Sequence, residues 1–406
     1  MSRFSESKVA ERWLKRFSET DREIAASLID EMLFVSGGEL SNSVTKLFEK
    51  IRAEHENQGP LAFYAEREVE WDKNQILPIF PGTRVGRAVG KGPQPIPFNP
   101  DRPEVGSEGL IANLITSYCR ANGKKTLNHP GPNLLRKRKA GPIIIVADFI
   151  GSGQRVWEML EAFRAVASIR SWQSYHLIDF YVVAYSGTEQ GLHLVRSSRL
   201  RPKILTVTGC PTIESAFRKP ARDAVNRLCR TYPPGEKSPL GYGWAGALIA
   251  FEHGVPNNVP PILHRGWSKW APLFQQRSTI AAKGEFPSTN REELAARAEQ
   301  LLRIRDAETY LSDSRGRRWI KTMLVLAAID VGARSRAQIS AYSRLKLETV
   351  REIVDFTEIA RWTTRKLTLS ALGRSELRRL KQRRARNPVL PKSNKPFYYP
   401  TQLRAR

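Results

Sequence analysis

The pattern of apolar and polar positions divides the chain into three parts. Up to about residue 54, apolar residues recur at helical spacing, which predicts a helical segment. From about residue 59 to residue 277, short apolar runs alternate with amphipathic stretches, which predicts strands and helices in turn. From about residue 312 to residue 384, the pattern predicts three helices, two short strands around a tight turn, and a basic helix.

The middle part has the pattern of an α/β domain. The predicted strands are 75–80, 143–148, 180–185, 204–207 and 247–252, and the predicted helices are 109–120, 154–167, 187–198 and 220–231. Strands that alternate with helices indicate a mainly parallel sheet that is covered on both faces. Ligands of such sheets bind beyond the carboxyl ends of the strands, so we expect the chemistry there.

One strand end carries the most informative motif of the chain. Residues 143–153 read I-I-I-V-A-D-F-I-G-S-G, which is a buried strand with Asp148 at its end and a tight turn into a helix. The turn amides and the helix dipole would point at an anion, and Asp148 could accept hydrogen bonds from ribose hydroxyls. The predicted phosphate and ribose contacts are Gly151, Ser152, Gly153, Gln154 and Arg155.

A second strand end also carries polar groups. The predicted strand 247–252 ends in Glu252 and His253, which makes both residues candidates for acid–base catalysis. The alternative is a structural loop in which His253 only satisfies a neighbouring group. At Glu108, in the first turn of a predicted helix, the structural interpretation is favoured, because an acid suits a helix N-terminus.

The net charge of +26 is spread unevenly along the chain. Residues 301–406 hold 25 Lys and Arg against 9 Asp and Glu, a net charge of +16. This excess favours a nucleic-acid partner, although a generally basic proteome with a solubilising tail would look similar. Three widely spaced cysteines indicate neither a metal site nor disulfides, and therefore a reducing cytoplasm. No apolar run approaches the ~20 residues of a membrane helix.

The C-terminal part resembles a winged helix, with three helices followed by a two-stranded wing. Its third helix and wing would contact nucleic acid, and the expected contacts are Arg344, Lys346, Arg351, Arg365 and Lys366. The third helix also carries acids that would repel phosphates, namely Glu348, Glu352, Asp355 and Glu358. Two alternatives therefore remain open: the domain binds a protein, or it binds nucleic acid through its wing and its basic tail.

The order of the motifs resembles a phosphoribosyltransferase-like family of bacterial conflict and antiphage systems, which includes retrons. The resemblance spans about residues 4–277. It rests on Trp13, on G-S-E at 106–108, A-D-F-I-G-S-G at 147–153, G-Y-G at 241–243, F-E-H with P-N-N at 251–258, and W-A-P-L-F at 270–274. Ala147 stands where that family usually has an acid, and Gly151 where the related transferases often have a general-base Asp.

The resemblance implies a mainly parallel α/β sheet of the type I phosphoribosyltransferase type. We expect a helical cap (1–58), the phosphoribosyltransferase-like domain (59–285), a linker helix (286–311), the winged helix (312–386) and a basic flexible tail (387–406). A basic loop would close over pyrophosphate, here Arg136, Lys137, Arg138 and Lys139, unless that run is only a solvated surface loop. Residues 82–87 resemble a second loop for the pyrophosphate, a ligand that commonly brings Mg²⁺.

The resemblance also implies a function in defence. The chain would be a toxic effector that acts on a nucleotide or phosphoribosyl ligand, as a transferase or an N-glycosidic hydrolase. A reverse transcriptase with its multicopy single-stranded DNA or RNA–DNA hybrid would hold it inactive until phage infection. The alternative is a catalytically inactive, nucleotide-sensing, DNA-binding transcriptional regulator, which the loss of the acid at Ala147 favours.

Overall fold

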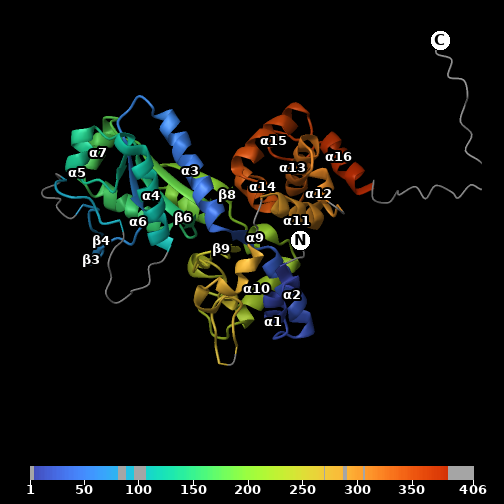
Figure 1. Ribbon diagram of the computed structural model, residues 1–406. Helices are drawn as coiled ribbons and strands as arrows, with labels where there is room; N and C mark the ends of the chain where they lie inside the picture. Colours follow the sequence, from blue (N-terminus) through green and yellow to red (C-terminus); the bar gives the residue numbers. More distant parts are fainter. Residues whose placement is uncertain are drawn as a thin grey trace, which may run out of the picture.

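The computed structural model describes residues 4–80, 88–95, 107–268, 270–286, 290–304 and 307–382 (Figure 1). Its centre is a five-stranded, wholly parallel sheet in the order β5-β2-β6-β7-β8. The strands are β2 (Leu61–Ala65), β5 (Thr126–Asn128), β6 (Ile143–Ile150), β7 (Phe180–Gly187) and β8 (Lys203–Gly209). The prediction of an α/β fold with a mainly parallel sheet is therefore confirmed.

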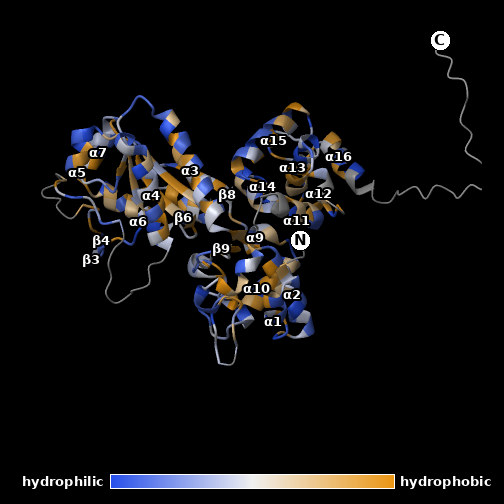
Figure 2. Cartoon of the chain, in the orientation of Figure 1, coloured by the Kyte–Doolittle hydropathy of each residue, from blue (hydrophilic) through white to orange (hydrophobic). Residues whose placement is uncertain are grey.

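Alternation along β6 explains why helices cover both faces of the sheet. Ile144 and Val146 belong to one apolar cluster, while Ile143, Ile145 and Ala147 belong to another on the opposite face. Helices α3 (Gly37–Glu54) and α4 (Ser107–Asn122) contribute to the first cluster. The second cluster is completed by α5 (Pro132–Arg138), α6 (Gln154–Arg164), α7 (Ala167–Ser174) and α8 (Glu189–Arg196). Figure 2 shows apolar residues along the strands of the sheet and a mixture of apolar and polar residues along the helices that cover it.

The sequence missed two strands of this sheet and misplaced two others. Strands β2 and β5 lie where no strand was predicted, while the predicted strand 75–80 is only β4 (Gln75–Ile76), paired with β3 (Trp71–Asp72). The predicted strand 247–252 is β9 (Ile249–Phe251), which pairs with β1 (Leu33–Val35) outside the central sheet. Strands of five and three residues are too short for periodicity to reveal them.

The N-terminal segment folds onto the loops of the sheet domain. It comprises α1 (Lys8–Leu14), α2 (Glu19–Asp30), β1 and α3, so it contains a strand in addition to the expected helices. Trp13 and Phe17 pack edge-on, and Phe17 does the same with Tyr232 and Trp270. Helices α9 (Ile213–Ala216) and α10 (Ala221–Thr231) complete this side of the molecule.

The C-terminal part has the helices of a winged helix. They are α13 (Ser314–Asp330), α14 (Arg336–Ser343), α15 (Leu347–Ile359) and α16 (Ala371–Gln382), and Asp313 and Ser335 cap the first two. The expected wing is reduced to a tight turn closed by one antiparallel bridge between Thr363 and Leu369. Preceding helices α11 (Asn290–Leu302) and α12 (Ala307–Tyr310) share the same apolar core.

The predicted loop at 82–87 and the predicted tail at 387–406 lie outside the described residues. Within the described part of the chain, no helix combines the length and the apolar character that crossing a membrane requires.

Candidate active site at the carboxyl edge of the sheet

The order of the strands itself points to a site. Strand β2 lies between β5 and β6. From β2 the chain adds β5 on one side and β6, β7 and β8 on the other, so the direction of winding changes between β2 and β6. Ligands of open parallel sheets bind outside the carboxyl ends of the strands at such a switch point. The backbone N–H of Glu66, directly after β2, donates to the carbonyl of Val146 at 2.8 Å. Glu66 and Asp148 therefore end neighbouring strands at this edge.

Buried Asp148 pairs with His253, whose side chain is 20% exposed. The Oδ2 atom of Asp148 lies 3.0 Å from Nε2 of His253, and its Oδ1 accepts from the N–H of Phe149 at 2.8 Å. An ionised carboxylate only accepts, so we assign the ring proton of His253 to Nε2. The His253 ring also stacks on Phe251, with the ring centroids 5.1 Å apart. These contacts bring together two residues that were predicted for the site, and their catalytic role stays a prediction.

Glu66 is an acid that the sequence did not single out. Burial raises the pKa of its carboxyl from 4.5 to about 7, against the opposing effect of Arg155, and Asp148 and Glu108 raise it further. The residue is only 8% exposed. A carboxyl that titrates near neutral pH can both donate and accept a proton under working conditions, which is what general acid–base catalysis needs.

Arg155 is held by carboxylates rather than left open to a phosphate. Its guanidinium lies 2.7 Å from Glu108, 2.9 Å from Glu68 and 3.6 Å from Glu66. The side chain is still about half exposed, so a ligand could compete with the two more exposed acids. Glu108 sits in the first helical turn, as expected, but it also joins the site through Arg155.

The loop at residues 151–153 packs closely against the start of α8. Gly153 begins α6 at a φ of +80°, and a Cβ there would overlap the carbonyl of Gly191. The Oγ1 of Thr188 donates to the carbonyl of Gly151 at 2.6 Å, which ties the loop to the start of α8. Ser152 accepts from the N–H of Gln154 at 3.3 Å, so this predicted phosphate loop has the expected strand–turn–helix form.

The segment that packs beside this loop carries two exposed aromatic residues. A Cβ on Gly243 would lie 2.8 Å from Cβ of Ser152, and the flanking Tyr242 and Trp244 are each 53% exposed. Asn258 holds this segment by donating to the carbonyl of Tyr242 at 2.9 Å. Exposed rings next to a phosphate loop are suited to stacking on a nucleobase.

The side chain of Glu252 points away from Asp148. Its Oε2 accepts from the N–H of Gly37 at the start of α3, at 2.8 Å, and its Oε1 lies 3.7 Å from Nζ of Lys283. The two adjacent residues therefore face different surroundings: His253 joins the site, while Glu252 stabilises a helix N-terminus. The structure does not bring the predicted acid–base pair together.

The basic run 136–139 lies at the wrong edge of the sheet for pyrophosphate at Asp148. Arg136, Lys137 and Arg138 form the last turn of α5, and Lys139 caps it. The guanidinium of Arg136 donates to the carbonyl of Ala88 at 2.6 Å and lies over the ring of Trp172. This run precedes β6, and the strand from Ile143 to Asp148 alone spans about 16 Å at ~3.3 Å per residue.

The predicted nucleic-acid contacts fall into two groups. Arg344 donates to the carbonyl of Asp30 at 3.0 Å, and Lys346 pairs with Glu39 at 2.9 Å, so both face the first domain. Arg351, Arg365 and Lys366 are exposed. The latter three stay predicted contacts, whereas Arg344 and Lys346 are engaged within the molecule.

The acids of the site are arranged around Arg155, not around a metal position. Among the described residues, no group of three or more His, Cys, Asp or Glu side chains is placed to hold a metal ion. The expected Mg²⁺ stays a prediction.

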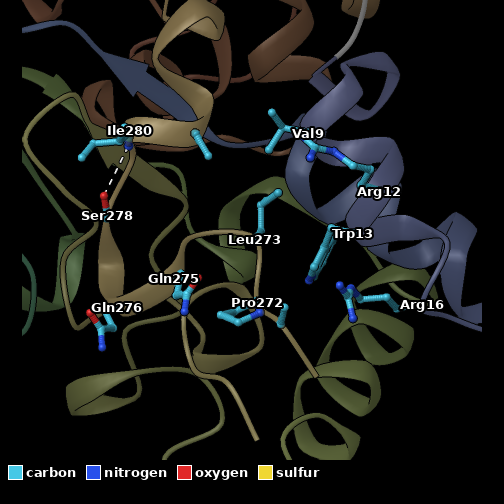
Figure 3. Close-up of a pocket in the computed structure, with 12 residues that line it drawn as sticks. Val9, Arg12, Trp13, Arg16, Pro272, Leu273, Gln275, Gln276, Ser278 and Ile280 are labelled. Carbon is cyan, nitrogen blue, oxygen red and sulfur yellow. Dashed lines mark hydrogen bonds between the residues drawn. The ribbon is translucent and has the colours of Figure 1, made fainter. Parts of the chain in front are cut away.

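A separate groove of about 520 Å³ lies between α1 and residues 271–281 (Figure 3). Arg12, Trp13 and Arg16 line one side, and Pro272 and Leu273 line the other. None of the residues named for the site above lines this groove.

The sequence did contain a signal for Glu66, the site acid that was not predicted. The run L-A-F-Y-A at 61–65 follows Gly59 and Pro60 and is followed directly by Glu66, the same order of strand and acid as at Asp148. What the sequence could not show is that the two strands are neighbours, because their pairing joins residues about 80 positions apart.

The comparisons with known proteins agree with this architecture. The family model PRTase-CE matches residues 10–276, and the model described as wHTH-PRTase associated matches residues 323–405. No match was found among the curated proteins or the solved structures. The first match covers more than half of the chain and includes β2, β6 and both strand-end acids. The chain therefore belongs to the PRTase-CE family and carries a wHTH-PRTase associated domain at its C-terminal end.

Proposed function

We propose that the chain is an antiphage defence effector of the retron-associated type. Its phosphoribosyltransferase-like domain acts on a nucleotide or phosphoribosyl ligand, and its winged helix couples it to nucleic acid and a reverse-transcriptase complex. The observation that carries the enzymatic part is the meeting of Glu66 and the Asp148–His253 pair at the switch point of the sheet. The family resemblance supports the defence part.

The reaction that suits these groups is cleavage of the bond between ribose C1 and a base. Positive charge develops on the ribose as this bond breaks, and a carboxylate stabilises it, as in glycoside hydrolysis. Asp148 is that carboxylate, held in place by His253. Protonated Glu66 gives its proton to the departing nitrogen, and water adds to C1 and returns a proton to Glu66. With pyrophosphate as the leaving group and an acceptor nucleophile in place of water, the same site would act as a transferase.

The binding groups for such a ligand lie next to these acids. The amides at the start of α6 suit a 5′-phosphate, because a helix N-terminus carries partial positive charge. Tyr242 and Trp244 offer exposed rings for a base. Phosphate, ribose and base thus each have a candidate partner within one edge of the sheet.

The winged helix is packed where it could influence this site. Ser335 and Gln338 of α14 donate to Glu189 at 2.5 and 2.9 Å. Glu189 follows Thr188, which holds the carbonyl of Gly151 in the phosphate loop. A partner that moves α14 would therefore disturb contacts of the residue next to Thr188, which holds the phosphate loop. This short path supports control of the enzyme through the winged helix.

The test is metabolite profiling of cells that express the chain, with Asp148→Asn as the variant and Asp179→Asn as the matched control. Asp179 is an exposed residue at the opposite end of the sheet, paired with Lys203. We expect the wild type and the control to deplete one nucleotide or phosphoribosyl pyrophosphate, and Asp148→Asn to deplete none. A fully toxic and phage-protective Asp148→Asn would refute the catalytic assignment.

The alternative is a catalytically inactive, nucleotide-sensing, DNA-binding transcriptional regulator. The observation that favours it is Ala147, which is buried in the apolar core, so no second acid accompanies Asp148 on its strand. A footprint on defined promoter DNA, released or strengthened by a nucleotide, would support the regulator. Loss of a nucleotide in expressing cells would support the enzyme.

A further inference from the structure

The part of the winged helix that would enter a major groove is occupied by the first domain. Ser340 of α14 is fully buried, and its Oγ lies 3.0 Å from Oγ1 of Thr208 and accepts from the N–H of Gly209 at 3.1 Å. At the start of α15, Lys346 is paired with Glu39. Helix-turn-helix proteins place this helix start against the base edges. While α14 stays docked on the first domain, the start of α15 cannot reach the base edges of a major groove.

The exposed side of α15 is also unsuited to phosphates. Glu348, Glu352 and Asp355 are exposed there, and Arg351 is their cationic neighbour on the same helix. Asp355 is in turn 3.5 Å from Arg336. Excess negative charge on this helix opposes approach of a polyanion.

Exposed cations lie on another surface of the domain, formed by α13, the wing turn and α16. We call it the arginine face, and it consists of Arg318, Arg361, Arg365, Lys366, Arg374 and Arg378, all exposed. Arg318 lies over the ring of Phe356 at 5.0 Å, and Phe356 packs edge-on against Trp362. The carbonyl of Trp362 accepts from the N–H of Ser370 at 2.9 Å, just before α16. These contacts link α13 to the C-terminal half of α15 and to the wing turn, and α16 follows directly after that turn.

This face lies away from the docked side. Helices α14 and α15 contact β8, whereas α16 contacts α13. Figure 1 shows α16 on the side of the winged helix that is turned away from β8. A ligand on the arginine face would therefore leave the contacts of Ser340 in place.

We propose that the arginine face binds the phosphate backbone of a nucleic acid while α14 stays docked on β8. The inference rests on the proposed function for its nucleic-acid partner and names the surface that takes it. Its basis is charge complementarity, because six exposed cations on α13, the wing turn and α16 match a polyanion. Contacts to phosphate carry no sequence information, so binding would not depend on sequence.

The experiment measures the affinity of the full chain for labelled duplex DNA and for an RNA–DNA hybrid by fluorescence anisotropy over a range of salt. The variant is Arg374→Glu with Arg378→Glu, both on α16. The matched control is Arg227→Glu with Arg230→Glu, two exposed arginines of α10 in the first domain. We expect the α16 variant to bind at least tenfold more weakly near ~0.1 M salt. We expect its log–log salt slope on DNA to fall by about 2, at ~0.9 per lost phosphate contact.

Three results would overturn the proposal: unchanged binding in the α16 variant, an equal loss in the control, or a larger loss in Arg351→Glu on α15. Binding of polyglutamate without binding of nucleic acid would overturn it in favour of an acidic protein partner. A thermal melt of the α16 variant like that of the wild type excludes misfolding, and Arg365→Glu with Lys366→Glu provides an independent second variant. Asp148→Asn should bind nucleic acid normally, which separates this test from that of the enzymatic function.

Discussion

At the scale of residues, the site joins two carboxyl groups in different surroundings. Asp148 accepts from a backbone N–H and from His253, while Glu66 is buried with Arg155 3.6 Å away. Burial raises the pKa of Glu66 to about 7. Sites that place two acids in unlike environments commonly divide the roles of proton donor and charge stabiliser between them.

Replacing Glu66 by Gln should remove the proton donor while keeping the shape of the side chain. We expect nucleotide depletion to slow by about 10²–10⁴-fold, the usual contribution of general acid–base catalysis. Glu68→Gln is the control, because Glu68 shares Arg155 but is 63% exposed. Equal activity of Glu66→Gln and the wild type would exclude Glu66 as the acid.

The raised pKa of Glu66 also predicts how stability depends on pH. Between pH 4.5 and about 7 the folded state holds the Glu66 proton and the unfolded state has lost it. The free energy of unfolding therefore falls as pH rises through this window, by about 3 kcal/mol at most. Gln at this position cannot titrate, so its melting temperature should fall less than that of the wild type from pH 5 to pH 8. Parallel melting curves for the two proteins would contradict the assignment.

At the scale of elements, the contact between α14 and the end of β8 is the closest junction of the two domains. A Cβ on Gly209 would overlap the carbonyl oxygen of Ala337, a backbone atom that cannot move alone. The hydroxyl of Ser340 fills the remaining space and satisfies the N–H of Gly209. Glycine at position 209 is thus required by the docking of α14, not by the turn.

Gly209→Ala should push α14 away from β8. We expect faster hydrogen exchange in α14 and α15, measured by mass spectrometry, with exchange in β6 unchanged. The control is Gly38→Ala in α3, where a Cβ would meet no atom within 4 Å. Unchanged protection of α14 in Gly209→Ala would mean that the two domains are not held together at this point.

At the scale of the whole molecule, charged groups join the winged helix to the N-terminal segment. Lys346 pairs with Glu39, Arg344 donates to the carbonyl of Asp30, and buried Arg297 lies 3.1 Å from Glu31. Two of these cations, Arg344 and Lys346, are ones that a free winged helix would offer to phosphates. Docking and use of the α15 N-terminus for nucleic acid therefore compete for the same side chains.

A charge swap tests this competition. Lys346→Glu should repel Glu39 and loosen the docked state, and adding Glu39→Lys should restore it. The readout is hydrogen exchange in α14, together with the number of transitions in thermal unfolding. Surface ion pairs contribute only ~0–1 kcal/mol and this pair is partly buried, so we expect a partial effect that the double variant reverses. Failure of Glu39→Lys to rescue Lys346→Glu would show that the pair does not contribute to docking.

Much of the fold could be predicted because it follows from local patterns in the sequence. The long apolar runs of β6, β7 and β8, the helices between them and the helices of the winged domain follow from periodicity and caps. Strands β2 and β5 were missed, because runs of five and three residues do not stand out. The wing was predicted as two short strands, because threonines flank its turn. Only one bridge forms there.

The candidate site was predicted in part. Asp148, His253 and the loop at 151–153 follow from a strand end, a loop and a helix start that are contiguous in sequence or carried by a family motif. Glu66 was not predicted, since its role depends on β2 lying beside β6. Glu252 and the run 136–139 were placed by sequence order, which does not reveal the direction of a side chain or the edge of the sheet.

The sequence by itself thus determined most of the helices, strands β6 to β8, the α/β class, the acid at the end of β6 and the excess of positive charge in the C-terminal part. Each of these depends on neighbours within a few residues, where propensity, periodicity and composition act. Only the tertiary structure decided which strand ends meet, which cations are engaged by the other domain and which face of the winged helix is free. Those outcomes depend on pairings between distant residues, such as β2 with β6 and Lys346 with Glu39, which no local pattern encodes.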